Sequence, residues 1–313
     1  MQDERKVIVI GAGAVGSTYA FGLMRTGLAD EIVLVDLDRE RAEAEALDMN
    51  HGLFFAPPVR LRAGDYDDCT GAELVVITAG AAQKPGQSRL ELVQTNAAIC
   101  REVADQVCQR SRDAILLLVT NPVDVLTRVV LEHTDLRPGQ VIGSGTVLDS
   151  ARFRFLLSRK LHVDPRNVHA YIAGEHGDSE VALWSMCHVA GIPLAECCEQ
   201  WDDRVEPLDQ EAILQQVRSS AYHLIESKGA TTFGVDLALE RITAAILRDE
   251  NSVLTVSSRP DGHYGIDDVC LSLPSVVNRR GVDRIIPAKL PDDERAGLAA
   301  SARVLEDTYR QLG

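Results

Sequence analysis

The sequence has no long hydrophobic run. The apolar stretch Val7–Ile10 is too short for the core of a signal peptide. Ile115–Val119 is likewise far shorter than the stretch of about 20 residues that a membrane-spanning helix needs. We therefore expect a cytoplasmic protein without a membrane partner.

Basic residues are also scarce. The chain has 32 Lys and Arg against 47 Asp and Glu, which gives a formal net charge of −15. A surface for nucleic acid or for an anionic membrane needs clustered positive charge, so we expect neither partner. A few local arginines can still bind a small anionic ligand.

Cysteine pairs with metal-binding spacing are missing too. The seven cysteines form an odd, scattered set without a CxxC motif. This pattern argues against a disulfide framework and against a structural zinc site. We expect reduced thiols and no metal.

The 313 residues are enough for two packed domains. In the first half, short apolar runs rich in β-branched residues alternate with segments of helical periodicity. These runs are Lys6–Ile10, Glu31–Val35, Leu74–Ile77, Ile115–Val119 and Val141–Ile142. Continuous apolar strands separated by helices predict a parallel sheet that is covered on both faces.

The pattern changes after residue 146. The predicted elements are a helix over Leu148–Leu161, a strand over Val168–Ala173, a turn over Gly174–Ser179, one long helical region from Asp209 to Arg248, strands near Val253–Val256 and Val269–Leu273, and a last helix from Asp292 or Asp293. We expect a nucleotide-binding domain over residues 1–146, packed on an α+β domain over residues 147–313. The working site should lie between them.

A GxGxxG motif, formed by Gly11, Gly13 and Gly16, follows the first strand and opens a helix. Such glycines permit a tight turn, close approach of the backbone to a pyrophosphate, and close packing of the helix on the sheet. Asp36 ends the second strand, where an acidic side chain can bind the adenosine ribose and repel a 2′-phosphate. The pattern favours NAD over NADP.

Further polar segments occur where ligands bind in open α/β sheets, beyond the carboxyl ends of the strands. Thr78–Gly80 and Thr120–Pro122 follow predicted strands, and residues 80–89 resemble a mobile lid. Later in the chain, Asp149 and Arg152 open a helix, and His176 lies in a turn.

Five motifs, in this order and spacing, resemble the L-lactate dehydrogenase branch of the lactate/malate dehydrogenase family: GAGAVG, ITAGAAQKPGQSRLEL, VTNPVD, GTVLDSARFR and GEHGDSE. The resemblance covers essentially the whole chain, including KGATTFGVDLAL at 228–239. It implies an N-terminal Rossmann domain with a doubly wound parallel sheet and a C-terminal α+β substrate domain. The implied activity is reversible hydride transfer between lactate or pyruvate and NAD(H).

The resemblance assigns roles to four residues. His176 is implied to take the hydroxyl proton of lactate and to return it during pyruvate reduction, which suits an imidazole. Asp149 is implied to stabilise the cationic imidazole. Arg152 matches the residue that binds the substrate carboxylate through two parallel hydrogen bonds. Arg89 is implied to polarise the reacting carbonyl.

The resemblance also implies the rest of the site. Asn121 is expected to contact both the nicotinamide ribose and the substrate, before a cis peptide bond to Pro122, and Thr231 is expected to line the substrate pocket. Further contacts to the cofactor are implied for Val15, Tyr66, Gly80, Ala81, Asn121 and Ser144.

Gln83 bears on the choice between lactate and malate. A malate enzyme needs a cation at this position to neutralise the second carboxylate of its substrate. A neutral Gln leaves that carboxylate unpaired, which is unfavourable in a closed site, but accommodates a methyl group. The sequence therefore favours lactate.

Arg154 and His169 match positions at which bacterial lactate dehydrogenases bind fructose 1,6-bisphosphate across a subunit interface. Arg and a protonatable His suit a phosphate group. The resemblance thus implies a homotetramer that the sugar bisphosphate activates.

Three alternative functions stay open at this point. The nearest is a malate dehydrogenase. An NAD-dependent glycosidase shares the dinucleotide domain but works with a metal, and the sequence offers no convincing Cys/His ligand pair. The third is a catalytically silent NAD-binding sensor.

Overall fold

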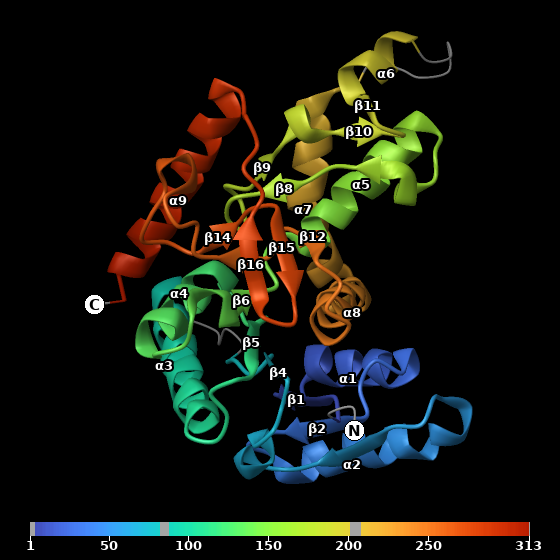
Figure 1. Cartoon of the computed structure of the whole chain (residues 1–313), viewed down its shortest axis with the longest axis vertical. Coiled ribbons are helices and arrows are strands. Elements are labelled where there is room, and N and C mark those ends of the chain that lie inside the picture. The colour runs from blue at the N-terminus through green and yellow to red at the C-terminus, as the bar shows by residue number, and fades with distance from the viewer. Residues whose placement is uncertain (1–3, 82–87, 201–207, 313) are drawn as a thin grey trace.

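The computed structural model describes residues 4–81, 88–200 and 208–312, and of Arg89 and residues 198–200 the backbone alone. In Figure 1 the N-terminal elements, drawn in blue to green, form the lower part of the molecule, and the C-terminal elements lie above them. None of the helices in the described part of the chain combines the length and apolar character of a membrane span.

The main sheet has eight strands in the order β14-β13-β6-β5-β4-β1-β2-β3. The six strands of the first half are β1 (Lys6–Ile10), β2 (Glu31–Val35), β3 (Arg60–Ala63), β4 (Leu74–Ile77), β5 (Ile115–Leu118) and β6 (Val141–Gly143). These six are all parallel, in the order of a doubly wound dinucleotide-binding sheet. The predicted fold class is confirmed.

Both faces of this sheet are buried, as the continuous apolar strands predict. The helices of the first half are α1 (Ala14–Thr26), α2 (Arg39–His51), α3 (Arg89–Cys108) and α4 (Val123–His133). In β1, Val7 and Val9 belong to the core with α1 and α2, whereas Ile8 and Ile10 belong to the core with α3 and α4. Successive side chains of a strand point to opposite faces, so each face receives every second residue.

Strand β3 was not among the predicted strands. It is the edge strand of the sheet, and only Leu61 of its four side chains is fully buried. Arg62 bonds Glu31 and Asp68 from this edge. An edge strand with one buried residue lacks the apolar run by which the other five were recognised.

The second half is mixed. Its helices are α5 (Val147–Leu161), α6 (Leu194–Gln200), α7 (Gln210–Lys228), α8 (Phe233–Leu247) and α9 (Asp292–Arg310). Its strands are β7 (Val168–His169), β8 (Ile172–Ala173), β9 (Val181–Ala182), β10 (His188–Val189), β11 (Ile192–Pro193), β12 (Ser252–Leu254), β13 (Ser257–Ser258), β14 (Leu271–Ser272), β15 (Ser275–Asn278) and β16 (Gly281–Ile285). Short 3-10 turns lie at Leu53–Phe55, Tyr66–Cys69, Pro138–Gln140, Pro165–Asn167, Trp184–Met186 and His263–Gly265.

Two predictions for this half were wrong in detail. The expected single strand over Val168–Ala173 is two strands, because β7 pairs with β10 whereas β8 pairs with β9. The expected helical region from Asp209 to Arg248 is two helices, α7 and α8. Gly229 ends α7 with a left-handed backbone (φ 85°), which is a common helix stop.

The two halves share the main sheet. Strands β13 and β14 come from the second half and extend it in antiparallel fashion beyond β6. Gly174 forms a bridge with Ser272 of β14. The turn that carries His176 is thereby held at the edge of the sheet.

Candidate active site

The GxGxxG turn lies beside a cavity of about 470 Å³. Gly11 has a left-handed backbone (φ 106°), and a Cβ atom at Gly16 would lie 1.9 Å from the Gly11 carbonyl oxygen. Gly13 faces open space and is the N-cap of α1, so the first N–H groups of this helix are accessible to an anion. The turn therefore suits a dinucleotide pyrophosphate.

Asp36 ties the end of β2 to this turn. Its Oδ2 accepts a hydrogen bond from the backbone N–H of Ala12 at 2.6 Å, and its Oδ1 accepts one from Asp38 at 2.9 Å. The carboxylate is thus held at the cavity wall, where it can also meet a ribose hydroxyl. Arg41, which we did not single out in the sequence, lines the same cavity.

The structure brings most of the predicted cofactor residues together, but not all. Those that line this cavity are Gly11, Gly13, Asp36, Tyr66, Gly80 and Ala81. Val15 instead packs against the core, and Asn121 lines a different cavity. Ser144 donates its backbone N–H to the Leu118 carbonyl, between β5 and the start of α5. Direct contact of Val15 and Ser144 with a cofactor stays a prediction.

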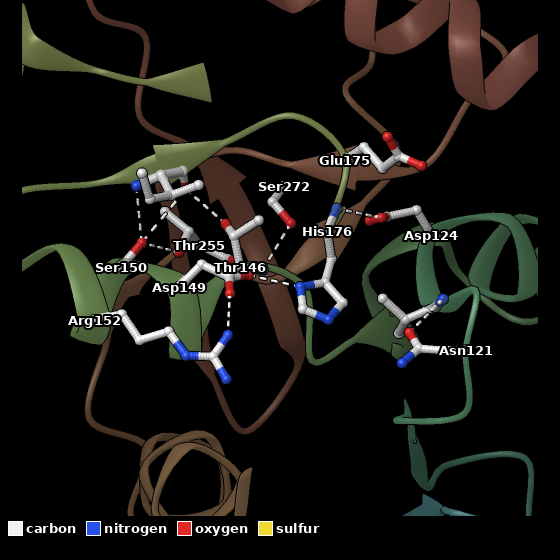
Figure 2. A network of polar contacts seen from close by, with 12 residues as sticks. Asn121, Asp124, Thr146, Asp149, Ser150, Arg152, Glu175, His176, Thr255 and Ser272 are labelled. Atoms are coloured by element: carbon white, nitrogen blue, oxygen red, sulfur yellow. Dashed lines mark hydrogen bonds and ion pairs between the residues drawn. The ribbon is translucent and has the colours of Figure 1, made fainter. Parts of the chain in front are cut away.

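A second cavity, of about 250 Å³, brings together Asn121, Asp149, Arg152 and His176. Figure 2 shows the imidazole of His176 and the guanidinium of Arg152 on either side of the Asp149 carboxylate. His176 Nδ1 lies 2.6 Å from Asp149 Oδ2, and Arg152 Nη1 donates to Asp149 Oδ1 at 2.7 Å. Because Asp149 occupies Nδ1, the other ring nitrogen of His176 is left for a substrate.

The charge of His176 follows from this arrangement. Burial lowers its pKa, but the adjacent Asp149 carboxylate raises it more, and the pKa of His176 is raised to about 9. Burial raises the pKa of Asp149, whereas His176 and Arg152 lower it, with a net lowering. The imidazole is therefore cationic near neutral pH and can donate a proton.

Buried hydrogen bonds position these side chains. Thr146 precedes α5 and donates its hydroxyl to the Ile172 carbonyl at 2.6 Å and its N–H to Ser272 Oγ at 3.0 Å. The backbone N–H of His176 donates to Asp124 Oδ2 at 2.7 Å. Figure 2 shows this network linking α5, β14 and the His176 turn. Asp124 was not recognised in the sequence, although it lies in the VTNPVD motif.

Asn121 follows the end of β5, and the peptide bond to Pro122 is cis, as expected. Asn96, a buried residue of α3, donates to the Asn121 carbonyl at 3.0 Å and accepts from the Ala81 N–H at 2.8 Å. It therefore connects the ends of β4 and β5. The sequence offered no signal for Asn96 beyond a polar residue in an apolar helix face.

Three predicted substrate residues are not placed in this cavity. Gln83 lies outside the described residues, and so does the side chain of Arg89, whose backbone begins α3. Thr231 lies between α7 and α8, and its buried hydroxyl has no hydrogen-bond partner among the described residues. Conversely, Glu180 and Arg218 line the cavity but were not singled out. Glu180 is the last residue of the GEHGDSE motif.

Arg154 and His169 line a third cavity, of about 610 Å³, on the other side of α5. Arg154 Nε donates to the Ala170 carbonyl at 2.9 Å, and its guanidinium lies 5.1 Å from the centre of the Tyr171 ring. Arg241 and Ser252 line the same cavity. Two arginines and a histidine thus converge there.

The geometry of these cavities agrees with a comparison of the chain with known protein families. Residues 5–143 match the NAD-binding domain of lactate/malate dehydrogenases, and residues 146–312 match their α/β C-terminal domain. The chain belongs to the lactate/malate dehydrogenase family. It is an NAD-dependent oxidoreductase, as the motifs predict.

Relatives within this family match the chain over its full length. It is 47% identical over 308 residues to an L-lactate dehydrogenase of Acetivibrio thermocellus, covering 98% of this chain and 97% of the relative. It is 50% identical over 307 residues to one from Nitratidesulfovibrio vulgaris, covering 98% and 99%. These relatives confirm the resemblance to the L-lactate dehydrogenase branch.

Solved structures agree with the sequence relatives. A lactate dehydrogenase from a Medee basin deep-sea metagenome superimposes with a TM-score of 0.96 at 43% identity and covers 99% of both chains. A minor L-lactate dehydrogenase of Enterococcus mundtii gives 0.95 at 41% identity, covering 99% of this chain and 98% of that one. The arrangement of the two halves is thus that of this dehydrogenase family.

Proposed function

We propose that this dehydrogenase interconverts L-lactate and pyruvate. The observation that carries the proposal is the hydrogen bond of 2.6 Å between His176 and Asp149, with Arg152 bound to the same carboxylate beside a cavity. The names of the full-length relatives support it. A proton donor and a carboxylate-binding guanidinium are the two groups that reduction of a small 2-oxo acid needs.

In this proposal the GxGxxG turn and Asp36 would hold NADH, which would supply the hydride. Arg152 binds the pyruvate carboxylate, and cationic His176 donates its proton to the carbonyl oxygen as that oxygen becomes an alcohol. Asp149 keeps the imidazole oriented and cationic until that step. In lactate oxidation, neutral His176 takes the hydroxyl proton instead.

Other residues complete the proposed site. Arg89 polarises the reacting carbonyl, Asn121 contacts substrate and nicotinamide ribose, and Thr231 lines the pocket. The support for Asn121 is its place in the cavity with His176. We place the domain boundary at residue 146, directly before α5, so that Asp149 and Arg152 belong to the second domain.

The test is NADH oxidation measured side by side with pyruvate, oxaloacetate and bulkier 2-oxo acids. We expect pyruvate to give the highest kcat/KM, because Gln83 provides no charge for a second carboxylate. His176→Asn should lose nearly all turnover while still binding NADH. A higher kcat/KM for oxaloacetate than for pyruvate would instead make the protein a malate dehydrogenase.

The proposed role of Gln83 has its own test. Gln83→Arg should shift the preference toward oxaloacetate, because the new guanidinium pairs with the second carboxylate. Gln83→Asn is the matched control, since it changes length but not charge. Unchanged discrimination in the Arg variant would remove Gln83 from substrate selection.

We also propose that fructose 1,6-bisphosphate activates a homotetramer of this cytoplasmic, fermentative enzyme through Arg154 and His169. Both residues line one cavity together with Arg241, which gives an anion site of sufficient size. Pyruvate saturation curves with the sugar bisphosphate should shift to lower pyruvate concentration. Superimposable curves at several pH values, or a monomer in analytical ultracentrifugation, would reject this part.

A further inference from the structure

Glu180 is a buried carboxyl group in the wall of the His176 cavity. It is 2% exposed, and it lines the cavity with Arg152 and His176. Its Oε1 has no hydrogen-bond partner among the residues that the structure describes. An ionised carboxylate in such a place is normally paired, because burying an uncompensated charge is strongly unfavourable.

Arg218 bonds the backbone of Glu180 and not its carboxyl group. Arg218 of α7 donates Nη2 to the backbone carbonyl of Glu180 at 2.7 Å, and its buried Nε lacks a hydrogen-bond partner within the described part of the chain. Glu175, in the same turn, differs from Glu180 because its carboxylate is hydrogen-bonded. Its Oε2 accepts hydrogen bonds from the backbone N–H of Ser179 at 3.2 Å and from its hydroxyl at 2.5 Å.

The electrostatic surroundings also disfavour a charge on Glu180. Burial and the Asp149 carboxylate raise its pKa, whereas His176, Arg218 and Arg152 lower it, and the pKa of Glu180 is raised to about 8. Glu180 is therefore mostly protonated at pH 7. Among the surrounding groups, Asp149 is already paired with both Arg152 and His176.

We propose that Glu180 must carry a proton for the 2-oxo acid to bind, so that the site requires two protonated groups, His176 and Glu180. The reason is charge. The substrate carboxylate needs the positive charge of Arg152, which Asp149 already shares. An ionised Glu180 would add a further negative charge to the same wall, and its repulsion would oppose binding of the substrate carboxylate. Asp178, Glu175 and Tyr222 also line this cavity, and Asp124 accepts a hydrogen bond from the His176 N–H.

This inference rests on the proposed reduction of pyruvate, and the pH dependence of that reaction tests it. At the alkaline end, loss of two required protons makes kcat/KM for pyruvate fall about 100-fold per pH unit, whereas loss of one gives about tenfold. We expect the wild type to follow the steeper course above pH 9. Glu180→Gln, which is permanently neutral, should follow the shallower one, because only His176 still titrates.

The alkaline midpoint in Glu180→Gln should also lie at the same pH as in the wild type or higher, because the wild type loses its first required proton from Glu180 as well as from His176. Near pH 6.5 the KM of Glu180→Gln for pyruvate should stay close to that of the wild type, because both enzymes carry a neutral group at position 180. Glu226→Gln, on the exposed surface of α7, is the control and should keep the steep wild-type course.

A second measurement separates binding from turnover. Oxamate, an unreactive analogue of pyruvate, is titrated into the complex of enzyme and NADH at pH 8.5 in buffers of different ionisation enthalpy. Proton uptake on binding should fall by more than half in Glu180→Gln, because the Glu180 carboxyl no longer takes up a proton.

If kcat/KM of the wild type falls only about tenfold per pH unit, the inference is overturned by the wild type alone. It is also overturned if the fall of about 100-fold persists in Glu180→Gln. If Glu180→Gln does not fold, the wild-type slope and the wild-type proton uptake decide. Absence of pyruvate-dependent NADH oxidation at every pH would refute the proposed function itself. That result differs from an active enzyme with a single alkaline ionisation.

Discussion

At the scale of single residues, charge in the site is set by a few buried contacts. Asp149 is 2% exposed and bonds both His176 and Arg152. Its carboxylate keeps the imidazole protonated despite burial, and it holds the guanidinium in place. Two predictions follow from these two contacts.

Replacing Asp149 by Asn should move the alkaline limb of pyruvate reduction to lower pH. Without the carboxylate, burial lowers the pKa of His176 against only the smaller opposing effects of Asp124 and Glu180, so this pKa should fall below about 9. The reaction needs the cationic imidazole, so activity is lost at a lower pH. The pH profile of kcat/KM checks this, with the exposed Asp307→Asn as control. An unshifted limb would show that Asp149 does not set the charge of His176.

Replacing Arg152 by Lys should raise the KM for pyruvate about 100-fold, which corresponds to about 2–3 kcal/mol from a lost charged hydrogen bond. An ammonium group cannot bind a carboxylate through two parallel N–H groups. Arg159→Lys, at the exposed end of the same helix, is the matched control. Steady-state kinetics measures both, and an unchanged KM in Arg152→Lys would contradict carboxylate binding at this residue.

At the scale of elements, the packing of α1 on α8 contains an unusual pair of acids. Asp236 and Glu240 lie one turn apart on α8 and approach α1 at Gly22. Burial and the Glu240 charge raise the pKa of Asp236 to about 7, although Arg25 lowers it. Asp236 Oδ1 is buried without a hydrogen-bond partner in the described residues. The contact is therefore more stable when Asp236 is protonated.

Stability should consequently fall as the pH rises from about 4, the ordinary pKa of Asp, through about 7, the value for Asp236 in the folded protein. Asp236→Asn removes this loss, so the variant should unfold at a higher temperature than the wild type at pH 8. The two should be alike near pH 4. Thermal denaturation across this range checks the prediction, with Asp307→Asn as the control. An equal difference at both pH values would point to packing instead of ionisation.

At the scale of the whole molecule, the two halves are joined by a shared sheet and by a buried junction before α5. Figure 1 shows β6 of the first half close to strands of the second. Thr146 is fully buried and bonds Ser272 and Ile172 of the second half. The elements that hold His176 and Arg152 depend on this junction.

Thr146→Val should therefore reduce the free energy of unfolding by about 1–3 kcal/mol, because the buried Ile172 carbonyl loses its 2.6 Å hydrogen bond and keeps only a longer one of 3.4 Å from the Ser150 hydroxyl. Urea denaturation measures the change. Thr95→Val is the control, since that hydroxyl bonds a carbonyl on the exposed face of α3. Equal losses of unfolding free energy in the two variants would show that the buried junction contributes no more to stability than an exposed hydrogen bond.

The match between sequence and structure is closest where local pattern and tertiary environment agree. Five predicted strands were confirmed because both of their faces are buried, and the GxGxxG turn was recognisable because its glycines meet steric demands. The structure also brings together Asp149 and His176, which separate motifs singled out. The split of β7 from β8 was missed, because pairing partners are set by distant strands.

The sequence by itself determined the parallel sheet, the family and the NAD cofactor, because apolar periodicity, glycine spacing and linked motifs are all local signals. Only the tertiary structure decided which charges are compensated. Asp149 and Glu180 are both acids near His176, yet one is bonded twice and the other has an unbonded buried oxygen in the described structure. Burial and partnership depend on chain segments far apart in the sequence, and these two properties set the pKa of a carboxyl group.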